Sequence, residues 1–263
     1  MNPYHNAIHA ADVFASLFYF YINTELRQFS SQFDVTCLLI SALGHDVGHP
    51  GVTNRFLIAS RDKIAIQYND ISVLENMHCS IIFSLLANEN FDILAEISNE
   101  DWANCRSLII GMILDTDLSK HFEICVKFKA KASMGAGFDL GKLDDKMLVY
   151  SMALKCSDIG HSAKCKELHL RWTGLVLEEF FMQGDTEKKL KIPVSMYCDR
   201  NNTDVPKSQA GFIKNICIPL YENWCFYLKS SHIDLCLKQL RDNFEYWDEN
   251  YKSKRLTNVQ KAE

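Results

Sequence analysis

Residues 233–251 read Ile-Asp-Leu-Cys-Leu-Lys-Gln-Leu-Arg-Asp-Asn-Phe-Glu-Tyr-Trp-Asp-Glu-Asn-Tyr, and this stretch decides the fold class. Its large apolar side chains recur at three- and four-residue steps, which places them on one face of an α-helix; they are Ile233, Leu237, Leu240, Phe244, Trp247 and Tyr251. The same spacing recurs over residues 9–21 and over 168–180, with Leu168, Trp172, Leu175, Val176 and Phe180. No stretch sustains an alternation of period two. We therefore predict an all-α fold.

Two stretches interrupt the helical spacing. Residues 134–143 hold three glycines, which predicts a mobile turn. Residues 184–208 are polar, contain Pro193 and Pro206, and are long for a simple connection, which favours a lid or a binding loop. Because no shift in composition marks a boundary, we predict one domain over residues 1–263.

The bulk composition bounds the class of protein. A chain of 263 residues can bury a large core, and its formal net charge of -5 gives no electrostatic reason to expect a nucleic-acid partner. No apolar run reaches the roughly 18 residues that span a bilayer, and residues 13–22 predict a core helix rather than a signal peptide. The ten cysteines form no Cys-x-x-Cys pair, which favours reduced core thiols in an intracellular, cytoplasmic protein.

The strongest local signal for a functional site is the heptapeptide His-Asp-Val-Gly-His-Pro-Gly of residues 45–51, which follows the apolar run 35–43. Its glycines and proline should end the helix directly after Asp46. A buried His-Asp pair is costly unless an ion or a hydrogen bond satisfies it. The pair therefore predicts either metal ligands or a buried hydrogen bond. As a ligand, the carboxylate can bridge two cations about 3.5–4 Å apart.

Two other places supply side chains of the same kind. His5 and His9 are four residues apart, and a helix that begins between them puts His5 at its mouth and His9 inside. Asp158 follows the apolar strip 147–156. Taken alone, the two histidines fit a structural pair and Asp158 fits a helix cap. With the pair at 45–46, they complete a His2Asp2 shell. Its imidazoles suit zinc, and an oxygen-rich position beside it suits magnesium or manganese.

Seven segments, in this order, resemble the class I cyclic nucleotide phosphodiesterases. They are residues 4–13 (Tyr-His-Asn-Ala-Ile-His-Ala-Ala-Asp-Val), 45–51, 68–76 (Tyr-Asn-Asp-Ile-Ser-Val-Leu-Glu-Asn), 116–121, 171–173, 178–185 and 207–212 (Lys-Ser-Gln-Ala-Gly-Phe). The similarity runs from residue 4 to about residue 250. It implies a compact helical catalytic domain of the His-Asp metal-dependent phosphohydrolase type. The implied reaction is hydrolysis of the 3′-phosphoester bond of cyclic GMP, cyclic AMP or both to the 5′-monophosphate, which ends the cyclic nucleotide signal.

The resemblance implies a role for each residue of the metal site. A hydroxide bridging two metals would attack phosphorus, and His5 would be the general acid that protonates the leaving O3′. The first metal, zinc, would be held by His9, His45, Asp46 and Asp158. Asp46 would also reach the second metal, magnesium or manganese, whose waters would be oriented by His49, Glu75 and Thr116.

The substrate pocket implied by the resemblance is a clamp for a purine ring. Gln209 would hydrogen-bond the purine edge, and Phe212 and Val176 would cover its two faces. The other lining residues would be Tyr4, Trp172, Leu177 and Phe180. His161 stands where cyclic-AMP-selective members usually carry Asn, so we expect hydrolysis of cyclic GMP or of both nucleotides. The alternative is that His161 caps a helix and touches nothing.

The resemblance is incomplete at the N-terminus. Catalytic domains of the family begin several helices before Tyr4, so we expect an N-terminally truncated domain whose regulatory regions, and any membrane attachment, lie upstream. Two alternatives stay open. One is a His-Asp phosphohydrolase acting on other nucleotides, against which Gln209 and Phe212 argue. The other is a catalytically inactive truncated paralogue that acts as a binding module.

The other histidines are expected to lie outside the metal site. His78 follows Glu75 by three residues, so we expect a structural pair on one helix face. His121, His169 and His232 lack neighbouring ligands in the sequence, and we expect them at the surface or at the rim of the pocket.

Overall fold

The computed structural model describes residues 1–135 and 137–260, and every regular element in them is a helix, which confirms the all-α prediction. Backbone contacts divide the chain into two compact units, Met1–Asp158 and Ile159–Glu263, and each is described by itself. Among the described residues, no helix combines the length and the apolar character that crossing a membrane requires.

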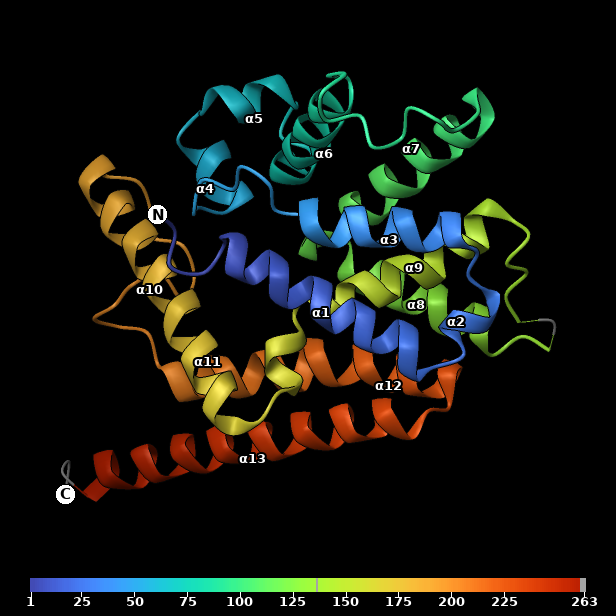
Figure 1. The fold of residues 1–263 in the computed structure, drawn as a ribbon. Coiled ribbons are helices and arrows are strands. Elements are labelled where there is room, and N and C mark those ends of the chain that lie inside the picture. Colours follow the sequence, from blue (N-terminus) through green and yellow to red (C-terminus); the bar gives the residue numbers. More distant parts are fainter. Residues whose placement is uncertain (136, 261–263) are drawn as a thin grey trace. The chain divides into compact units, whose positions relative to one another are not determined.

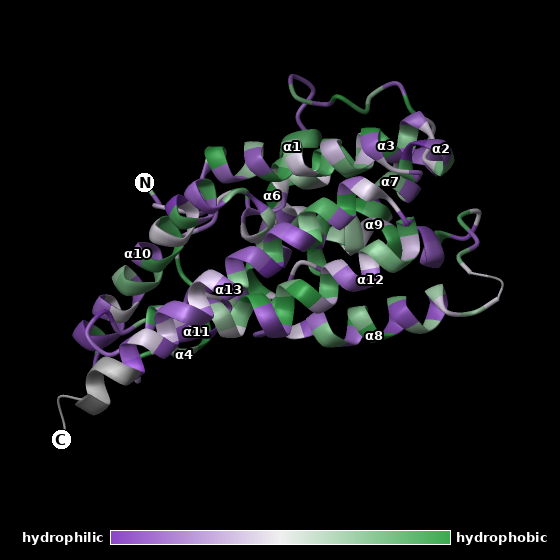
Figure 2. Ribbon diagram, turned by 90° about the horizontal axis from the view of Figure 1, so that it is seen from below, coloured by the Kyte–Doolittle hydropathy of each residue, from purple (hydrophilic) through white to green (hydrophobic). Residues whose placement is uncertain are grey.

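The first unit is organised around three helices that pack against one another, α1 (Ala7–Asn23), α3 (Gln32–Gly44) and α9 (Leu143–Asp158) (Figure 1). α7 (Asn99–Leu114) packs on α3 and α9, and α6 (Val73–Leu86) packs on α7. Hydrophobic residues recur along α1 and α9 (Figure 2). The remaining elements are α2 (Leu26–Phe29), α4 (Asn54–Ala59), α5 (Lys63–Gln67), η1 (Leu118–Lys120) and α8 (His121–Ala132).

Local capping and turn chemistry decides where the site-bearing helices begin and end. α1 begins between His5 and His9, as predicted, because the side chain of Asn6 accepts hydrogen bonds from the first-turn amides. α3 ends at Gly44 rather than directly after Asp46, so that prediction is wrong. A tight turn, with Gly48 at φ 75°, replaces the last helical residues. α9 ends at Asp158, as expected.

The second unit contains four α-helices in its described part: α10 (Lys166–Leu190), α11 (Val205–Phe212), α12 (Ile218–Leu228) and α13 (Ser231–Gln260). A 3₁₀ turn, η2 (Gly160–Ala163), precedes α10, and a π-helical turn, η3 (Ile213–Cys217), joins α11 to α12. α13 packs on α11, α12 and η2. Its residues Ile233, Leu240 and Trp247 are buried, in agreement with the spacing in the sequence.

The apolar stripe of residues 168–180 is not the buried face of α10. Leu168 and Leu175 are 42% and 41% exposed, while the buried positions are mostly polar: His169, Thr173, Leu177, Glu179, Gln183, Gly184 and Glu187. The buried Glu187 is tolerated because it bonds to a neighbouring side chain and to the following loop. Glu187 accepts hydrogen bonds from Gln183 Nε2 (2.9 Å) and from the Ser195 backbone N–H (2.7 Å).

The two predicted loops have different outcomes: the loop over 184–208 is shorter than predicted, and the turn over 134–143 includes a residue outside the described part of the chain. Residues 184–190 continue α10, so the connection to α11 is only 191–204, and the prediction of one long loop over 184–208 is wrong in its first third. Gly184 packs directly on this connection, where an added Cβ would overlap the Cys198 carbonyl. In the predicted mobile turn 134–143, residue 136 lies outside the described residues, and the turn's mobility stays a prediction.

Candidate metal centre

The helices of the first unit bring four predicted ligands together: His9 in α1, His45 and Asp46 at the end of α3, and Asp158 at the end of α9. His9 Nε2 lies 3.3 Å from His45 Nε2, from Asp46 Oδ2 and from Asp158 Oδ1. His45 Nε2 lies 3.1 Å from the same Asp46 oxygen and 3.3 Å from the same Asp158 oxygen.

These distances fit a shared divalent cation. Ligands held tetrahedrally at about 2.0–2.1 Å from zinc lie about 3.3–3.4 Å from one another, and the five separations here are 3.1–3.3 Å. The tautomer of His45 supports the same reading. Its Nδ1 lies 2.9 Å from the Ala42 carbonyl and donates to it, so a neutral ring turns the Nε2 lone pair toward two carboxylates. Such an arrangement needs a cation or a proton between the groups.

The ionisation of the cluster follows from this crowding of opposite charges. Burial alone would lower the pKa of His45, but Asp46 and Asp158 raise it well above its usual value. The same two carboxylates raise the pKa of His9 against the effect of its burial. Burial would raise the pKa of Asp46, yet the neighbouring histidines hold it well below its usual range. The four groups therefore form a charged, compact ligand set.

The two oxygens of Asp46 face different partners. Oδ2 belongs to the four-ligand cluster, whereas Oδ1 lies 3.6 Å from Nε2 of His78. His78 is buried, and its Nδ1 lies 2.7 Å from the Val47 carbonyl, so the ring directs Nε2 at Asp46 just as His45 does. Asp46, His49 and His78 form a second group with metal-ligand spacing. The sequence reasoning paired His78 with Glu75 and so missed this contact.

His5 and His49 lie beside this centre and outside the four-ligand cluster. Their rings stack at 3.9 Å between centroids, and His5 Nε2 lies 3.9 Å from Asp46 Oδ2. Asn2 holds both residues, since its side-chain amide donates to the His5 carbonyl (2.9 Å) and to the His49 carbonyl (2.7 Å). The Tyr4 ring lies 4.6 Å from that of His9 and is buried. His5 is 21% exposed, which leaves a face of its imidazole accessible.

Glu75 and Thr116 lie on neighbouring elements of the same unit. Burial raises the pKa of Glu75, the hydrogen bonds from Asn54 lower it, and the negative charges of Asp117 and Asp46 raise it, so that together they bring this pKa to about 7. Asn54 donates to both carboxylate oxygens of Glu75, at 2.9 and 3.3 Å. The Thr116 hydroxyl donates to the Ile113 carbonyl at 2.7 Å, which leaves its oxygen free to accept. Nothing in the sequence pattern pointed to Asn54.

The second unit holds most of the residues predicted to bind the purine. His161 in η2 and Leu177 in α10 are buried, and four others are half-buried: Trp172, Val176 and Phe180 in α10 with Gln209 in α11. Phe212, also half-buried, ends α11. The His161 ring stacks on His169, with 3.4 Å between the two Nδ1 atoms. His161 therefore does touch a neighbour, and its role toward a substrate stays a prediction.

Two histidines expected at the surface are buried instead. His169 is fully buried, and Trp247 Nε1 donates to its Nε2 at 2.8 Å. His121 is 1% exposed, with Nε2 3.7 Å from the Cys125 sulfur. The apolar spacing of α10 does not reveal the burial of His169, because the buried positions of that helix are mostly polar. The burial of His121 could have been predicted, because Ile124, Cys125 and Phe128 follow it at three, four and seven residues on the buried face of α8. His232 is half-buried.

Helices converging on a histidine–aspartate cluster define the fold class of the His-Asp metal-dependent phosphohydrolases. The family described as 3′5′-cyclic nucleotide phosphodiesterase matches residues 4–240. This match covers most of the chain, which therefore belongs to that family. The resemblance seen in the sequence motifs is thereby confirmed.

The chain resembles curated relatives whose names give three different nucleotide specificities. The probable 3′,5′-cyclic-AMP phosphodiesterase pde-4 of Caenorhabditis elegans is 38% identical over 94% of this chain. The dual specificity calcium/calmodulin-dependent 3′,5′-cyclic nucleotide phosphodiesterase 1 of Drosophila melanogaster is 42% identical over 83%. The cGMP-specific 3′,5′-cyclic phosphodiesterase alpha of Plasmodium falciparum is 38% identical over 94%. The chain spans 37%, 26% and 26% of the lengths of these three relatives.

Proposed function

We propose that this protein hydrolyses the 3′-phosphoester bond of 3′,5′-cyclic nucleotides to give the 5′-monophosphate. The observation that carries the proposal is the convergence of His9, His45, Asp46 and Asp158 within hydrogen-bond distances of one another, in a chain that belongs to the cyclic nucleotide phosphodiesterase family. We further propose that residues 1–263 form its catalytic domain. Seven buried free cysteines favour a reducing, cytoplasmic location.

The ligand set suits two divalent cations of different kinds. Zinc fits the four-ligand cluster, and magnesium or manganese fits the position on the Oδ1 side of Asp46. There His49, Glu75 and Thr116 would orient the waters of the second cation. Two such cations, when bound, lower the pKa of water and neutralise charge on a phosphodiester. Asp46 would contribute to both positions, because its Oδ2 faces the four-ligand cluster and its Oδ1 faces His78.

His5 is proposed as the proton donor to the leaving O3′. An alkoxide is a poor leaving group, and a positioned acid contributes roughly 10²–10⁴-fold to the rate of such a step. The stack on His49 and the anchor at Asn2 fix the ring. The ring lies outside the four-ligand cluster, with Nε2 3.9 Å from Asp46 Oδ2.

The purine would be held by the side chains of the second unit. Gln209 has both a donor and an acceptor and can serve a 6-oxo or a 6-amino purine. Phe212 and Val176 would cover the ring, and Tyr4, Trp172, Leu177 and Phe180 would line the pocket. His161 favours cyclic GMP or both nucleotides over cyclic AMP alone. The relatives' names include all three specificities and so leave this choice to experiment.

Side-by-side hydrolysis of cyclic AMP and cyclic GMP by the zinc- and magnesium-loaded chain tests the proposal. Asp46→Asn should lose both metals and all turnover, whereas His5→Ala should keep its metals and lose about 10²–10⁴-fold in turnover. Gln209→Ala should weaken hydrolysis of both nucleotides. No turnover by a folded, metal-loaded wild type would favour the alternative, a truncated paralogue that only binds. Equal metal loss in the first two variants would overturn the division of roles.

A further inference from the structure

A buried lysine in α9 has no part in the proposed mechanism. Lys155 is 3% exposed and stands one helical turn before Asp158. Its ammonium group donates to the main-chain carbonyl of Asp115 at 2.7 Å, where α7 has just ended. One turn earlier, the Ser151 hydroxyl donates to the carboxylate of the same residue at 2.7 Å. Two side chains of α9 therefore hold both the backbone and the side chain of Asp115.

The end of α7 is a favourable place for this cation. The last carbonyls of a helix lack intrahelical partners and carry partial negative charge, which attracts a lysine. Lys120 occupies the same region and donates to the Leu114 carbonyl at 3.0 Å. Burial lowers the pKa of Lys155, and the negative charges of Asp158 and Asp115 act in the opposite direction. Burying an ammonium group is costly, so its hydrogen bond to the Asp115 carbonyl has to compensate for the lost hydration.

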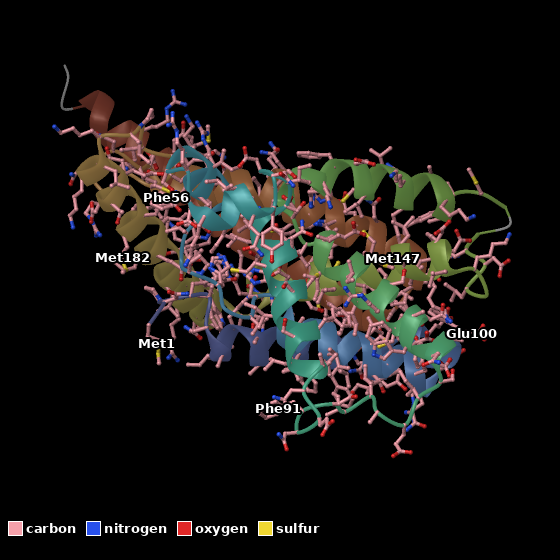
Figure 3. The ribbon with its side chains drawn as sticks, turned by 90° about the horizontal axis from the view of Figure 1, so that it is seen from above. Met1, Phe56, Phe91, Glu100, Met147 and Met182 are labelled. Atoms are coloured by element: carbon pink, nitrogen blue, oxygen red, sulfur yellow. The ribbon has the colours of Figure 1, made fainter. Side chains whose placement is uncertain are left out.

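α7 and α9 are close enough for this contact because of a glycine. The Met147 side chain, labelled in Figure 3, occupies the space beside Gly111 in α7 that a Cβ would fill. The two helices thus approach closely one turn before the lysine contact.

The residues held by Lys155 lead directly to the proposed second-cation side of the centre. Asp115 begins the turn 115–117, which contains Thr116. At the other end of the turn, the Asp117 carboxylate accepts a hydrogen bond from Ser72 at 2.8 Å, at the start of α6. The charge of Asp117, like that of Asp46, contributes to the raised pKa of Glu75. The turn therefore lies between α9 and the first turn of α6, which carries Glu75.

We propose that Lys155 is a positioning residue that fixes the turn 115–117 against α9 and so sets Thr116 and Asp117 relative to Glu75. The proposal rests on the proposed function for the identity of the second cation. Without the ammonium group, the carbonyl of Asp115 loses its partner and only the Ser151 contact holds the turn. The first cluster keeps all four ligands, because none of them belongs to the turn.

The test compares Lys155→Met with Lys146→Met in the 263-residue chain. Lys146 is the matched control: it also lies in α9 and its ammonium group also donates to an oxygen acceptor, the Asp34 carboxylate at 2.9 Å, but at the other end of the helix. In the metal-free chain, amide hydrogen exchange of residues 115–120 should quicken at least tenfold in Lys155→Met only. Manganese binding at the second position, measured by electron paramagnetic resonance in zinc-loaded protein, should weaken by about 10–100-fold. Zinc content by mass spectrometry should stay unchanged.

Further variants keep the test decisive. Lys155→Arg should restore part of the manganese affinity, because it still donates to the carbonyl. If Lys155→Met does not fold, Ser151→Ala, which removes the other side-chain contact to Asp115, should quicken the same exchange. Exchange and manganese affinity equal to those of Lys146→Met would overturn the proposal, and so would a loss of zinc together with manganese. Because neither readout uses substrate, a wild type that hydrolyses no cyclic nucleotide would refute the proposed function without deciding the role of Lys155.

Discussion

Replacing Asp34 with asparagine should lower the free energy of unfolding of the first unit by about 2 kcal/mol at pH 7. Asp34 is 1% exposed and accepts three hydrogen bonds: from the Ser31 amide (2.9 Å), the Ser31 hydroxyl (2.8 Å) and Lys146 Nζ (2.9 Å). Asparagine can still accept from Ser31 and so keeps the cap of α3. It loses the charge-assisted bond to Lys146, and such bonds contribute about 1.5–3 kcal/mol.

The pH dependence of this difference follows from the pKa of Asp34. Burial would raise that pKa, but the hydrogen bonds from Lys146 and Ser31 outweigh it and hold the pKa below 3.8. A carboxylate with a lowered folded-state pKa adds stability that is fully present above its unfolded value and is lost as the pH falls through the folded value. The difference between wild type and Asp34→Asn should therefore be constant from pH 7 to about pH 5 and shrink below about pH 4.

Urea unfolding of the metal-free chain at several pH values measures this difference. Lys142→Met is a suitable control, because its ion pair with Asp139 is exposed on both sides and should contribute about 0–1 kcal/mol. The double variant Asp34→Asn with Lys146→Met should cost clearly less than the sum of the two single changes. A wild type and an Asp34→Asn variant of equal stability at pH 7, or a difference that persists unchanged at pH 3, would refute the reasoning.

Three further outcomes can be checked directly. Gly184→Ala should lower the melting temperature by several degrees, because the new Cβ overlaps the Cys198 carbonyl. Gly174→Ala in the same helix, with no atom within 4 Å of the new Cβ, should not lower it. His161→Asn should shift the ratio of cyclic AMP to cyclic GMP turnover toward cyclic AMP, and an unchanged ratio would remove His161 from substrate recognition. A thiol reagent should modify Cys165 first in the native chain, since it alone among the ten cysteines is exposed, while Cys225 and Cys236 are half-buried; fast reaction of more than three would contradict the burial of the other seven.

The parts of the fold that hydrophobic spacing controls were predictable. The stripe of α13 was predicted correctly, because large apolar side chains there do face the core. In α10 the same spacing failed, because polar residues such as Gln183 and Glu187 are buried through mutual hydrogen bonds that no periodicity reveals. The premature end of α3 came from a turn whose first hydrogen bond returns to Gly44, a detail of backbone geometry rather than of composition.

The candidate site was predictable where residue types and spacing are distinctive. His9, His45, Asp46 and Asp158 come together as the chemistry of the ligands suggested. His78 was missed because its contact with Asp46 joins residues 32 positions apart through the end of α3. This contact depends on the orientation of the His78 ring, which is set by a hydrogen bond from its Nδ1 to the Val47 carbonyl. Asn54, which donates to Glu75, was missed because this contact also joins residues far apart in the sequence.

The boundary between the two compact units falls directly after Asp158. All four atoms of the ligand cluster thus come from the segment before the boundary, whereas His161, Gln209 and Phe212 come from the segment after it. Substitutions that alter nucleotide preference in the second unit can accumulate without disturbing the packing of α1, α3 and α9. Under the proposed function, the chain would carry its metal ligands before residue 159 and most of its purine-binding residues after it. Exchanging residues 159–263 between relatives of different specificity would be a natural way to transfer nucleotide preference.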